Sequence, residues 1–439
     1  MKETTNRQIL HTAMQMVYDE GCQEAKAVLM QNHEDTIQVR GGHVEKLQRA
    51  APTSLALNLF IDGREGFFYT NDLAIDSLHR FVRQAVATTR MLEPDADRTL
   101  ADPQRYYRGG GPELKNYDAT LSDIEPERKI RLATSHNTDA SLSHPAIISA
   151  ETHYSDRQHR AEYLISNGFE GSEASSYCTL TTIVTVEGRD GQHPMDGWGE
   201  TRIFFDDMPT TGIADVALQR TLRKIGQRPT KSGTYTMLVE SPVAGNLLQP
   251  LLSAMNGQAL QQRMSFLEGR QHTQVGSTLL HLIDDPLQPG TRGACHFDYD
   301  GTATSRRTLF DEGRLQTYFI DTLYARKLHM APTTQGTHHL ILQPGDKSLN
   351  ELMQAAGNGI LVTDFNGGNC DPSTGNFSYG IEGFVLRDGK LAEPVSGMNI
   401  TGNMLELWQR LVGAANDADP WETELIPSLM FEGVHFAGN

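Results

Sequence analysis

The sequence is short of positive charge. Its 439 residues include 38 Lys and Arg against 55 Asp and Glu, which gives a formal net charge of −17. Proteins that bind nucleic acid neutralise phosphates with clustered Lys and Arg, so this balance argues against a nucleic-acid function. The segment with Arg220, Arg223, Lys224, Arg228 and Lys231 is the best candidate for a basic patch, and a solvated helix face is the interpretation we favour.

Cysteines are few and long apolar runs are missing. Cys22, Cys178, Cys295 and Cys370 lie far apart and form no C-x-x-C pair, which indicates a reducing compartment. The segment Met1–Leu10 is polar and has no apolar core of the kind that signal peptides carry. No run of 18 apolar residues occurs, so we expect no membrane span and a cytoplasmic location.

The familiar catalytic motifs are also missing. The sequence contains no G-x-S-x-G elbow and no pair of His residues one helical turn apart with a Glu between them. His296, Asp298 and Asp300 alternate, so on a strand they would share one side and form a conceivable metal site; an Asp-rich hairpin is the interpretation we favour. Cys370 lies in a turn-rich loop, where a reactive thiol is an alternative to a plain loop cysteine.

Apolar periodicity and turn residues predict an α+β protein with two domains. The N-terminal α/β domain, residues 1–228, is expected to combine helices with a strand meander. The C-terminal domain, residues 229–439, is expected to be largely antiparallel β with a central helix at 242–257. The individual expectations are helices at 6–20, from 71, from 125, at 211–225 and at 349–356, and strands at 34–40, 43–50, 55–61, 65–70, 146–155, 161–166, 177–186, 235–240, 306–310, 314–318, 360–364, 381–386 and 390–394.

A series of short motifs in the second half of the chain resembles one protein family. Phe297–Gly301 (FDYDG) is followed by Arg306-Arg307 and by Tyr324–Leu328 (YARKL). Thr374–Gly380 (TGNFSYG) and Ile400–Asn403 (ITGN) come next in the same order. On these motifs the chain resembles the TldD/PmbA family, historically called modulators of DNA gyrase, and the match runs in order along essentially the whole chain.

Two branches of this family differ on the central helix. The TldD branch carries H-E-x-x-x-H there and resembles a zinc peptidase, whereas the TldE/PmbA branch lacks the motif. Here the motif would begin at Gln249-Pro250 and end at Ser253-Ala254, which supply neither an imidazole nor a carboxylate. Pro250 also removes a helix hydrogen bond, so we expect a kink. The resemblance therefore implies the TldE/PmbA type, with no catalytic residue, no metal and no other cofactor in this chain.

The resemblance also implies how such a chain works. It implies a non-catalytic subunit of a TldD–TldE-type zinc metallopeptidase that processes or degrades unfolded peptides, acting as a homo- or heterodimer, with zinc only in an H-E-x-x-x-H partner. The glycine-rich segment Asn366, Gly367, Gly368 and Asn369 is the expected peptide-binding loop, and a structural turn between two strands is its alternative. A hydrolase with an unrecognised site at His296, Asp298, Asp300 or Cys370, or a peptide-binding scaffold, stays open.

Overall fold

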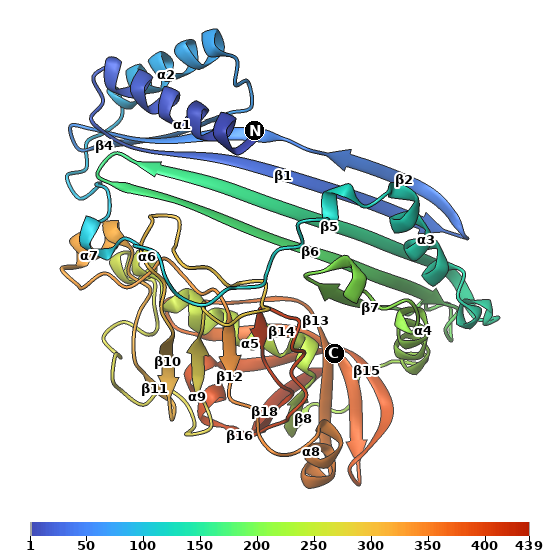
Figure 1. Ribbon diagram of the computed structural model, residues 1–439. Coiled ribbons are helices and arrows are strands. Elements are labelled where there is room, and N and C mark those ends of the chain that lie inside the picture. Colours follow the sequence, from blue (N-terminus) through green and yellow to red (C-terminus); the bar gives the residue numbers. More distant parts are fainter. Residues whose placement is uncertain (1, 439) are drawn as a thin grey trace.

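The computed structural model describes residues 2–438, with side chains from Asn6 onward; Met1 and Asn439, the ends of the two expected domains, lie outside the described residues. The fold is α+β, as the sequence predicts. A long, twisted sheet with helices on its outer face lies over a β-rich body that the C-terminal half forms (Figure 1). No helix in the described part of the chain is long and apolar enough to cross a membrane.

The N-terminal sheet is antiparallel, with strand order β4-β3-β1-β5-β6-β7 and β2 paired to β1. Helices α1 (Lys2–Asp19) and α2 (Ile75–Thr89) pack on one end of its outer face, and α3 (Pro126–Asn137) packs on the other (Figure 1). The strands are β1 (Glu24–Arg40), β2 (His43–Ala50), β3 (Thr53–Ile61), β4 (Arg64–Thr70), β5 (Ile147–Ile165), β6 (Phe169–Val186) and β7 (Met195–Arg202).

Strand β5 corrects one expectation, because the two strands predicted at 146–155 and 161–166 form a single strand. Thr152, Tyr154 and Asp156 are buried in its first half, whereas Ala161 and Tyr163 are buried in its second half. The first set packs on the outer face with α3, whereas the second packs on the opposite face with Phe297 of the C-terminal body. The sequence pattern breaks where the buried face changes, although the strand itself continues.

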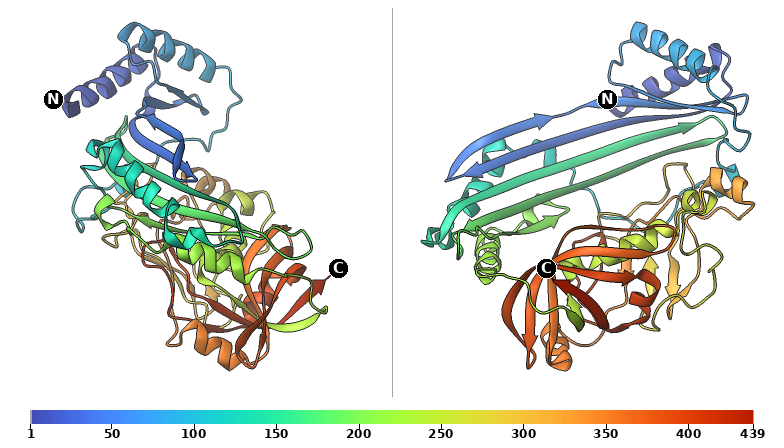
Figure 2. Two further views of the ribbon diagram at one scale, coloured as in Figure 1. Left: turned by 90° about the vertical axis from the view of Figure 1, so that its right-hand side faces the viewer. Right: turned by 180° about the vertical axis from the view of Figure 1, so that it is seen from behind.

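The C-terminal body contains a closed five-stranded barrel. Strand β8 pairs with β13 on one side and β18 on the other, and β14 and β15 complete the ring because β15 pairs with β18. A smaller sheet of order β11-β10-β9-β12-β17 lies beside it (Figure 2). The barrel and its flanking strand are β8 (Gly233–Val239), β13 (Gly359–Cys370), β14 (Asn376–Arg387), β15 (Lys390–Asn403), β16 (Leu411–Ala414) and β18 (Leu429–Gly438); the smaller sheet is β9 (Leu282–Asp284), β10 (Arg307–Asp311), β11 (Arg314–Leu315), β12 (Leu340–Leu342) and β17 (Glu424–Leu425).

The remaining helices connect these sheets. Helix α5 (Ser241–Ala254) follows β8, and Gly257, expected to close it, instead begins α6 (Gly257–Gln261). Asn256 explains the difference, because its side chain accepts a hydrogen bond from the Gln258 amide and caps a new helix. The others are α4 (Ile213–Arg223), α7 (Thr322–Leu328), α8 (Leu349–Ala356) and α9 (Met404–Gln409).

Candidate functional site

Helix α5 is anchored by its apolar face. Pro242 lies in the first turn, where the missing amide costs nothing. Leu247, Leu248 and Leu251 are fully buried in the C-terminal core. Pro250 lies inside the helix, which nevertheless runs as one segment to Ala254. Packing of the leucine face therefore holds the helix together despite the lost hydrogen bond.

The four residues singled out on this helix have different surroundings. Gln249 and Ser253 are exposed, Pro250 is half-buried, and Ala254 is 1% exposed in the core. The Gln249 Nε2 donates a hydrogen bond of 2.8 Å to Glu424 Oε1. Among residues 2–438, no group of three or more His, Cys, Asp or Glu side chains is arranged to hold a metal ion. The donor set present on this helix therefore does not fit zinc.

Next to the start of α5 lies a cleft of about 980 Å³ between the N-terminal sheet and the C-terminal body. One wall is β7, the last strand in the order of its sheet, and α5 contributes its first turn from Ser241 to Gly245. Thr363 and Asp364 of β13 and the segment 417–424 complete the lining. Because Gln249 bonds to Glu424 of this lining, the helix position singled out by sequence adjoins the cleft.

The cleft is strongly acidic. Eight carboxylates line it, against two arginines and no lysine or histidine; the carboxylates belong to Asp196, Glu200, Glu240, Asp364, Asp417, Asp419, Glu422 and Glu424. Arg220 contacts Glu240 at 3.0 Å and Asp196 at 3.5 Å, and Arg202 contacts Glu200 at 3.0 Å. Within the described residues, Asp364, Asp417, Asp419 and Glu424 have no ion pair. Burial raises the pKa of Glu424, although the hydrogen bond from Gln249 opposes the rise.

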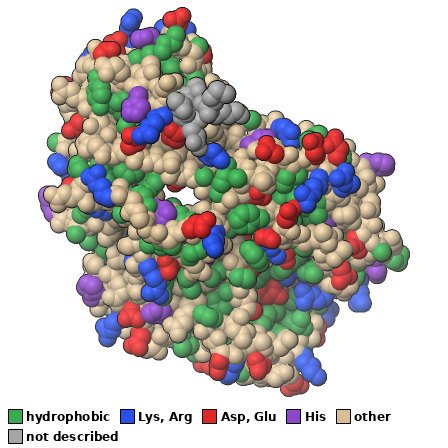
Figure 3. All heavy atoms as spheres, viewed as in Figure 1, with side chains coloured by type: hydrophobic (Ala, Val, Ile, Leu, Met, Phe, Trp, Pro, Cys, Tyr) green, Lys and Arg blue, Asp and Glu red, His purple; other side chains and the backbone are tan. Residues whose placement is uncertain are grey.

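The expectation for the basic segment holds only in part, because Arg223, Arg228 and Lys231 are exposed whereas the other two cations are not. The side chains of Arg220 and Lys224 are only 12% and 6% exposed, so they do not form a solvated helix face. Lys224 Nζ lies 2.9 Å from Glu382 and 3.1 Å from Asp196, and Arg220 bridges Asp196 and Glu240. These cations join the two halves of the chain instead of forming a basic surface. On the face seen in Figure 3, Lys and Arg are likewise scattered among Asp and Glu.

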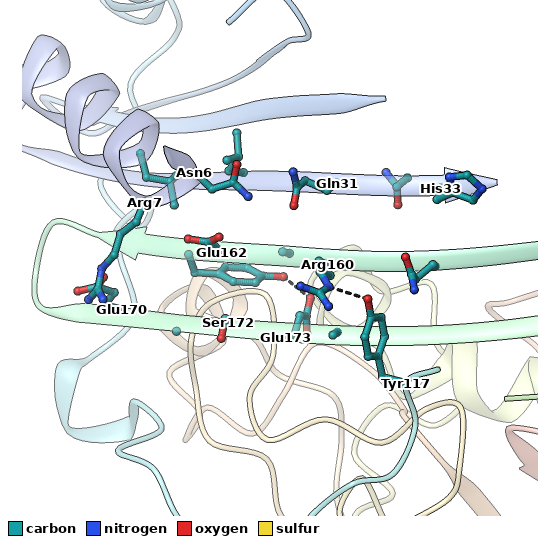
Figure 4. Close-up of a pocket in the computed structure, with 18 of the residues that line it drawn as sticks. Asn6, Arg7, Gln31, His33, Tyr117, Arg160, Glu162, Glu170, Ser172 and Glu173 are labelled. Atoms are coloured by element: carbon teal, nitrogen blue, oxygen red, sulfur yellow. Dashed lines mark hydrogen bonds and ion pairs between the residues drawn. The ribbon is translucent and has the colours of Figure 1, made fainter. Parts of the chain in front are cut away.

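A second, wider cavity of about 1530 Å³ lies on the outer face of the N-terminal sheet. Figure 4 shows its polar floor on β1, β5 and β6, beside α1. Arg160 Nε donates to the Tyr117 hydroxyl at 2.6 Å, and Arg7 pairs with Glu170 across the strands (Figure 4). Charges of both signs alternate here and several are paired to one another. This surface therefore lacks the one-sided charge of the cleft.

Models of known protein families match this chain along most of its length. Three domain models match consecutive stretches: PmbA/TldA metallopeptidase domain 1 at residues 25–89, the central domain at 119–225 and the C-terminal domain at 232–438. The chain belongs to the PmbA/TldD family. It is 22% identical to the metalloprotease PmbA of Escherichia coli over 92% of this chain and 90% of that protein.

Solved structures of PmbA/TldD relatives show the same fold. A protein from Bacteroides thetaiotaomicron, named as a modulator of DNA gyrase, is 42% identical, with a TM-score of 0.97 over 99% of both chains. TldE from Thermococcus kodakarensis is 17% identical, with a TM-score of 0.83 over 98% of this chain and 99% of that one.

The structure does not assemble the alternative, unrecognised metal site at His296, Asp298 and Asp300. The His296 ring stacks on Tyr107 with 5.1 Å between ring centroids. Asp298 accepts hydrogen bonds of 3.0 Å from the amides of residues 300 and 302, and burial raises its pKa to about 6. Asp300 pairs with Lys26 of β1 at 2.7 Å. The three side chains thus serve an Asp-stabilised turn and a contact between the two halves of the chain.

Cys370 and the predicted peptide-binding residues lie on the β13–β14 hairpin. Burial and the neighbouring Asp371 raise the pKa of Cys370 to about 11, which disfavours the thiolate that a nucleophile needs. Asn366, Gly367, Gly368 and Asn369 are exposed near the end of β13, and none of them lines the cleft. Gly367 and Gly368 have φ of +94° and +105°, and the pairing register shifts between Phe365 and Gly368, so these residues form a bulged part of the hairpin.

Sequence reasoning missed the cleft because its residues are far apart in the chain. Its walls come from β6, β7, α4, α5, β13 and the segment before β17. Strand β7, with the sequence MDGWGETR, has no apolar alternation and was not predicted. It forms because β6 supplies a partner along its whole length and α4 packs against it. The cluster Asp417, Asp419, Glu422 and Glu424 was the one available signal.

Proposed function

We propose that this chain is the non-catalytic, TldE/PmbA-like subunit of a two-component metallopeptidase that processes unfolded peptides. The observation that carries the proposal is helix α5, where Gln249, Pro250 and Ala254 occupy the H-E-x-x-x-H positions. A metallopeptidase needs a metal-bound water to attack the peptide carbonyl, and these side chains hold no metal. In this proposal, zinc and the attacking water come from a TldD-type partner that carries the motif. The metalloprotease names of the relatives support a role in proteolysis.

The proposal also concerns assembly and location. We expect a heterodimer with the TldD-type partner, although a homodimer of this chain is also compatible with its sequence. The four cysteines are free, which supports a reducing compartment such as the cytoplasm.

The deciding experiment is reconstitution. This chain, a TldD-type relative and an unfolded peptide are mixed, and cleavage is followed by mass spectrometry. We expect cleavage only when both proteins are present, and its loss when the motif glutamate of the relative is replaced by Gln. As a matched control, Cys370→Ser in this chain should leave most of the activity, because the raised pKa disfavours a nucleophilic role. Cleavage by this chain alone in excess chelator would overturn the proposal and favour an unrecognised hydrolytic site.

A further inference from the structure

One side chain of the acidic cleft lacks a partner that the fold should supply. Thr363 is 3% exposed and lines the cleft, yet its Oγ1 has no hydrogen-bond partner among the described residues. Buried hydroxyls are normally satisfied, so an unpaired one beside a cavity points to a ligand. The strand register shifts between Val362 and Asp364, which makes Thr363 the extra residue of a β-bulge. Such bulges re-aim side chains and are common next to binding sites.

The charges beside Thr363 select the ligand. Asp364, Asp417, Asp419 and Glu424 line the same cleft without an ion pair in the described part of the chain. They are not gathered around one point, since residues 2–438 contain no group of three such side chains able to hold a metal ion. Carboxylates spread along a cleft match several separated positive charges better than one cation. This arrangement favours a chain molecule with basic groups at intervals.

Two further features suit an extended peptide. Strand β7 ends the strand order of its sheet, so an added strand can pair with those main-chain groups of its outer edge that Asp196, Arg202 and Lys224 do not already bond. Trp198 and Trp421 line the cleft, and each already has an arginine over its ring, Arg220 at 5.5 Å and Arg202 at 4.6 Å. Each indole therefore lies where a cation contacts its face.

We infer that this cleft binds a Lys- or Arg-rich extended segment of a peptide, with Thr363 bonding to the peptide main chain and the unpaired carboxylates receiving its basic side chains. The inference rests on the proposed function and names its substrate class. It assigns the peptide to the cleft between β7 and α5, and not to the hairpin segment Asn366–Asn369.

The test measures binding by this chain alone, so it needs no partner enzyme. Fluorescein-labelled decapeptides with four Lys, four Glu or four Gln in the same Gly/Ser/Leu background are titrated, and Kd is read from anisotropy at low and moderate salt. We expect the Lys peptide to bind at least tenfold more tightly than the Glu peptide, with the difference shrinking as salt rises. Spermine serves as a competitor and should displace the Lys peptide only weakly. Equal affinity for all three peptides, or complete displacement by equimolar spermine, would overturn the inference.

Matched variants locate the site. Asp364→Asn, Asp419→Asn and Glu424→Gln each remove one unpaired charge, and each should raise Kd for the Lys peptide about threefold or more. Thr363→Val keeps the shape, should leave the urea unfolding midpoint unchanged or higher, and should weaken all three peptides alike. Glu93→Gln and Asp388→Asn remove exposed charges outside the cleft and should change Kd less than 1.5-fold. Cleft variants that behave like these two controls would contradict the assignment.

The experiments distinguish failure of the proposed subunit role from failure of the cleft assignment. Binding of the Lys peptide with no cleavage after the TldD-type partner is added would remove the subunit role and leave the cleft assignment standing. Partner-dependent cleavage of Lys and Glu peptides at equal rates, unchanged by the cleft variants, would do the opposite.

Discussion

Lys129 of α3 is buried between two carboxylates, and its replacement by Met is expected to destabilise the N-terminal sheet severely. Its Nζ lies 2.7 Å from both Asp35 of β1 and Asp156 of β5, and the three side chains are 0–2% exposed. Asp35 keeps a second partner, because Arg49 donates to both of its oxygens at 2.7 and 2.8 Å. Asp156 keeps only the Tyr154 hydroxyl, and its Oδ1 already has no partner. The variant therefore leaves one uncompensated buried carboxylate.

The magnitude follows from that stranded charge. Removing one partner of a buried ion pair costs about 3–5 kcal/mol in free energy of unfolding, and the Asp156 side fits this case. Burial already raises the pKa of Asp156, with the hydrogen bonds from Lys129 and Tyr154 opposing the rise. Without Lys129 this pKa rises further, so protonation relieves the defect as pH falls through it. The loss should be largest near pH 7–8 and smaller near pH 5.

Urea unfolding followed by far-UV circular dichroism measures the effect. Lys46→Met removes an exposed lysine from β2 and serves as the control, with an expected change within about 0.5 kcal/mol. Adding Asp156→Asn to the Lys129→Met chain removes the stranded charge and should recover about half of the loss. A Lys129→Met cost below about 1 kcal/mol at pH 7.5, or a cost that grows as pH falls, would refute the reasoning.

Three other outcomes are expected. Lys26→Met should lower the free energy of unfolding by about 2 kcal/mol and speed proteolysis between the two halves of the chain. The reason is that Lys26 Nζ donates to Asp300 Oδ1 at 2.7 Å and to the Tyr299 carbonyl at 3.1 Å. Unchanged proteolysis kinetics would argue against a stabilising role for this contact. Asp298→Asn retains the hydrogen-bond acceptor of the turn and should stabilise the chain at pH 7 by up to ~3 kcal/mol. The pKa of the Asp298 carboxyl is raised to about 6, so its ionisation lowers the free energy of unfolding as pH rises from about 4 to 6. Urea titrations in which both chains show the same dependence on pH would contradict this prediction. Elemental analysis of the purified chain should find no stoichiometric zinc, and about one zinc per chain that disappears in Asp298→Asn would revive the rejected site.

The predictable part of the fold is the part set by short-range signals. The turns at Gly41-Gly42, Asp62-Gly63 and Asp388-Gly389 adopt positive φ and join the expected hairpins β1–β2, β3–β4 and β14–β15. Strand β7 pairs with β6, the strand just before it, but its residues show no apolar alternation. Strand β18 and the continuity of β5 depend on partners distant in sequence, β8 and β1. The alternation of polar and apolar residues along a strand does not reveal a distant partner. In β5 this alternation shifts by one residue at the point where the buried face of the strand changes.

On helix α5, too, one part of the candidate site can be predicted from the sequence and another part cannot. Sequence alone shows that Gln249, Pro250 and Ala254 supply no zinc ligands, because ligand chemistry is a property of residue type. What Gln249 does instead, bonding to Glu424 at the edge of an acidic cleft, depends on a contact 175 residues away. The helix also limits any return of the motif. Position 249 is exposed, whereas Ala254 is 1% exposed and its carbonyl accepts a hydrogen bond from the Ser265 hydroxyl, so an imidazole at position 254 would have to displace packed core. The leucine face therefore anchors this helix in the core, and the exposed Gln249 contacts the cleft through Glu424.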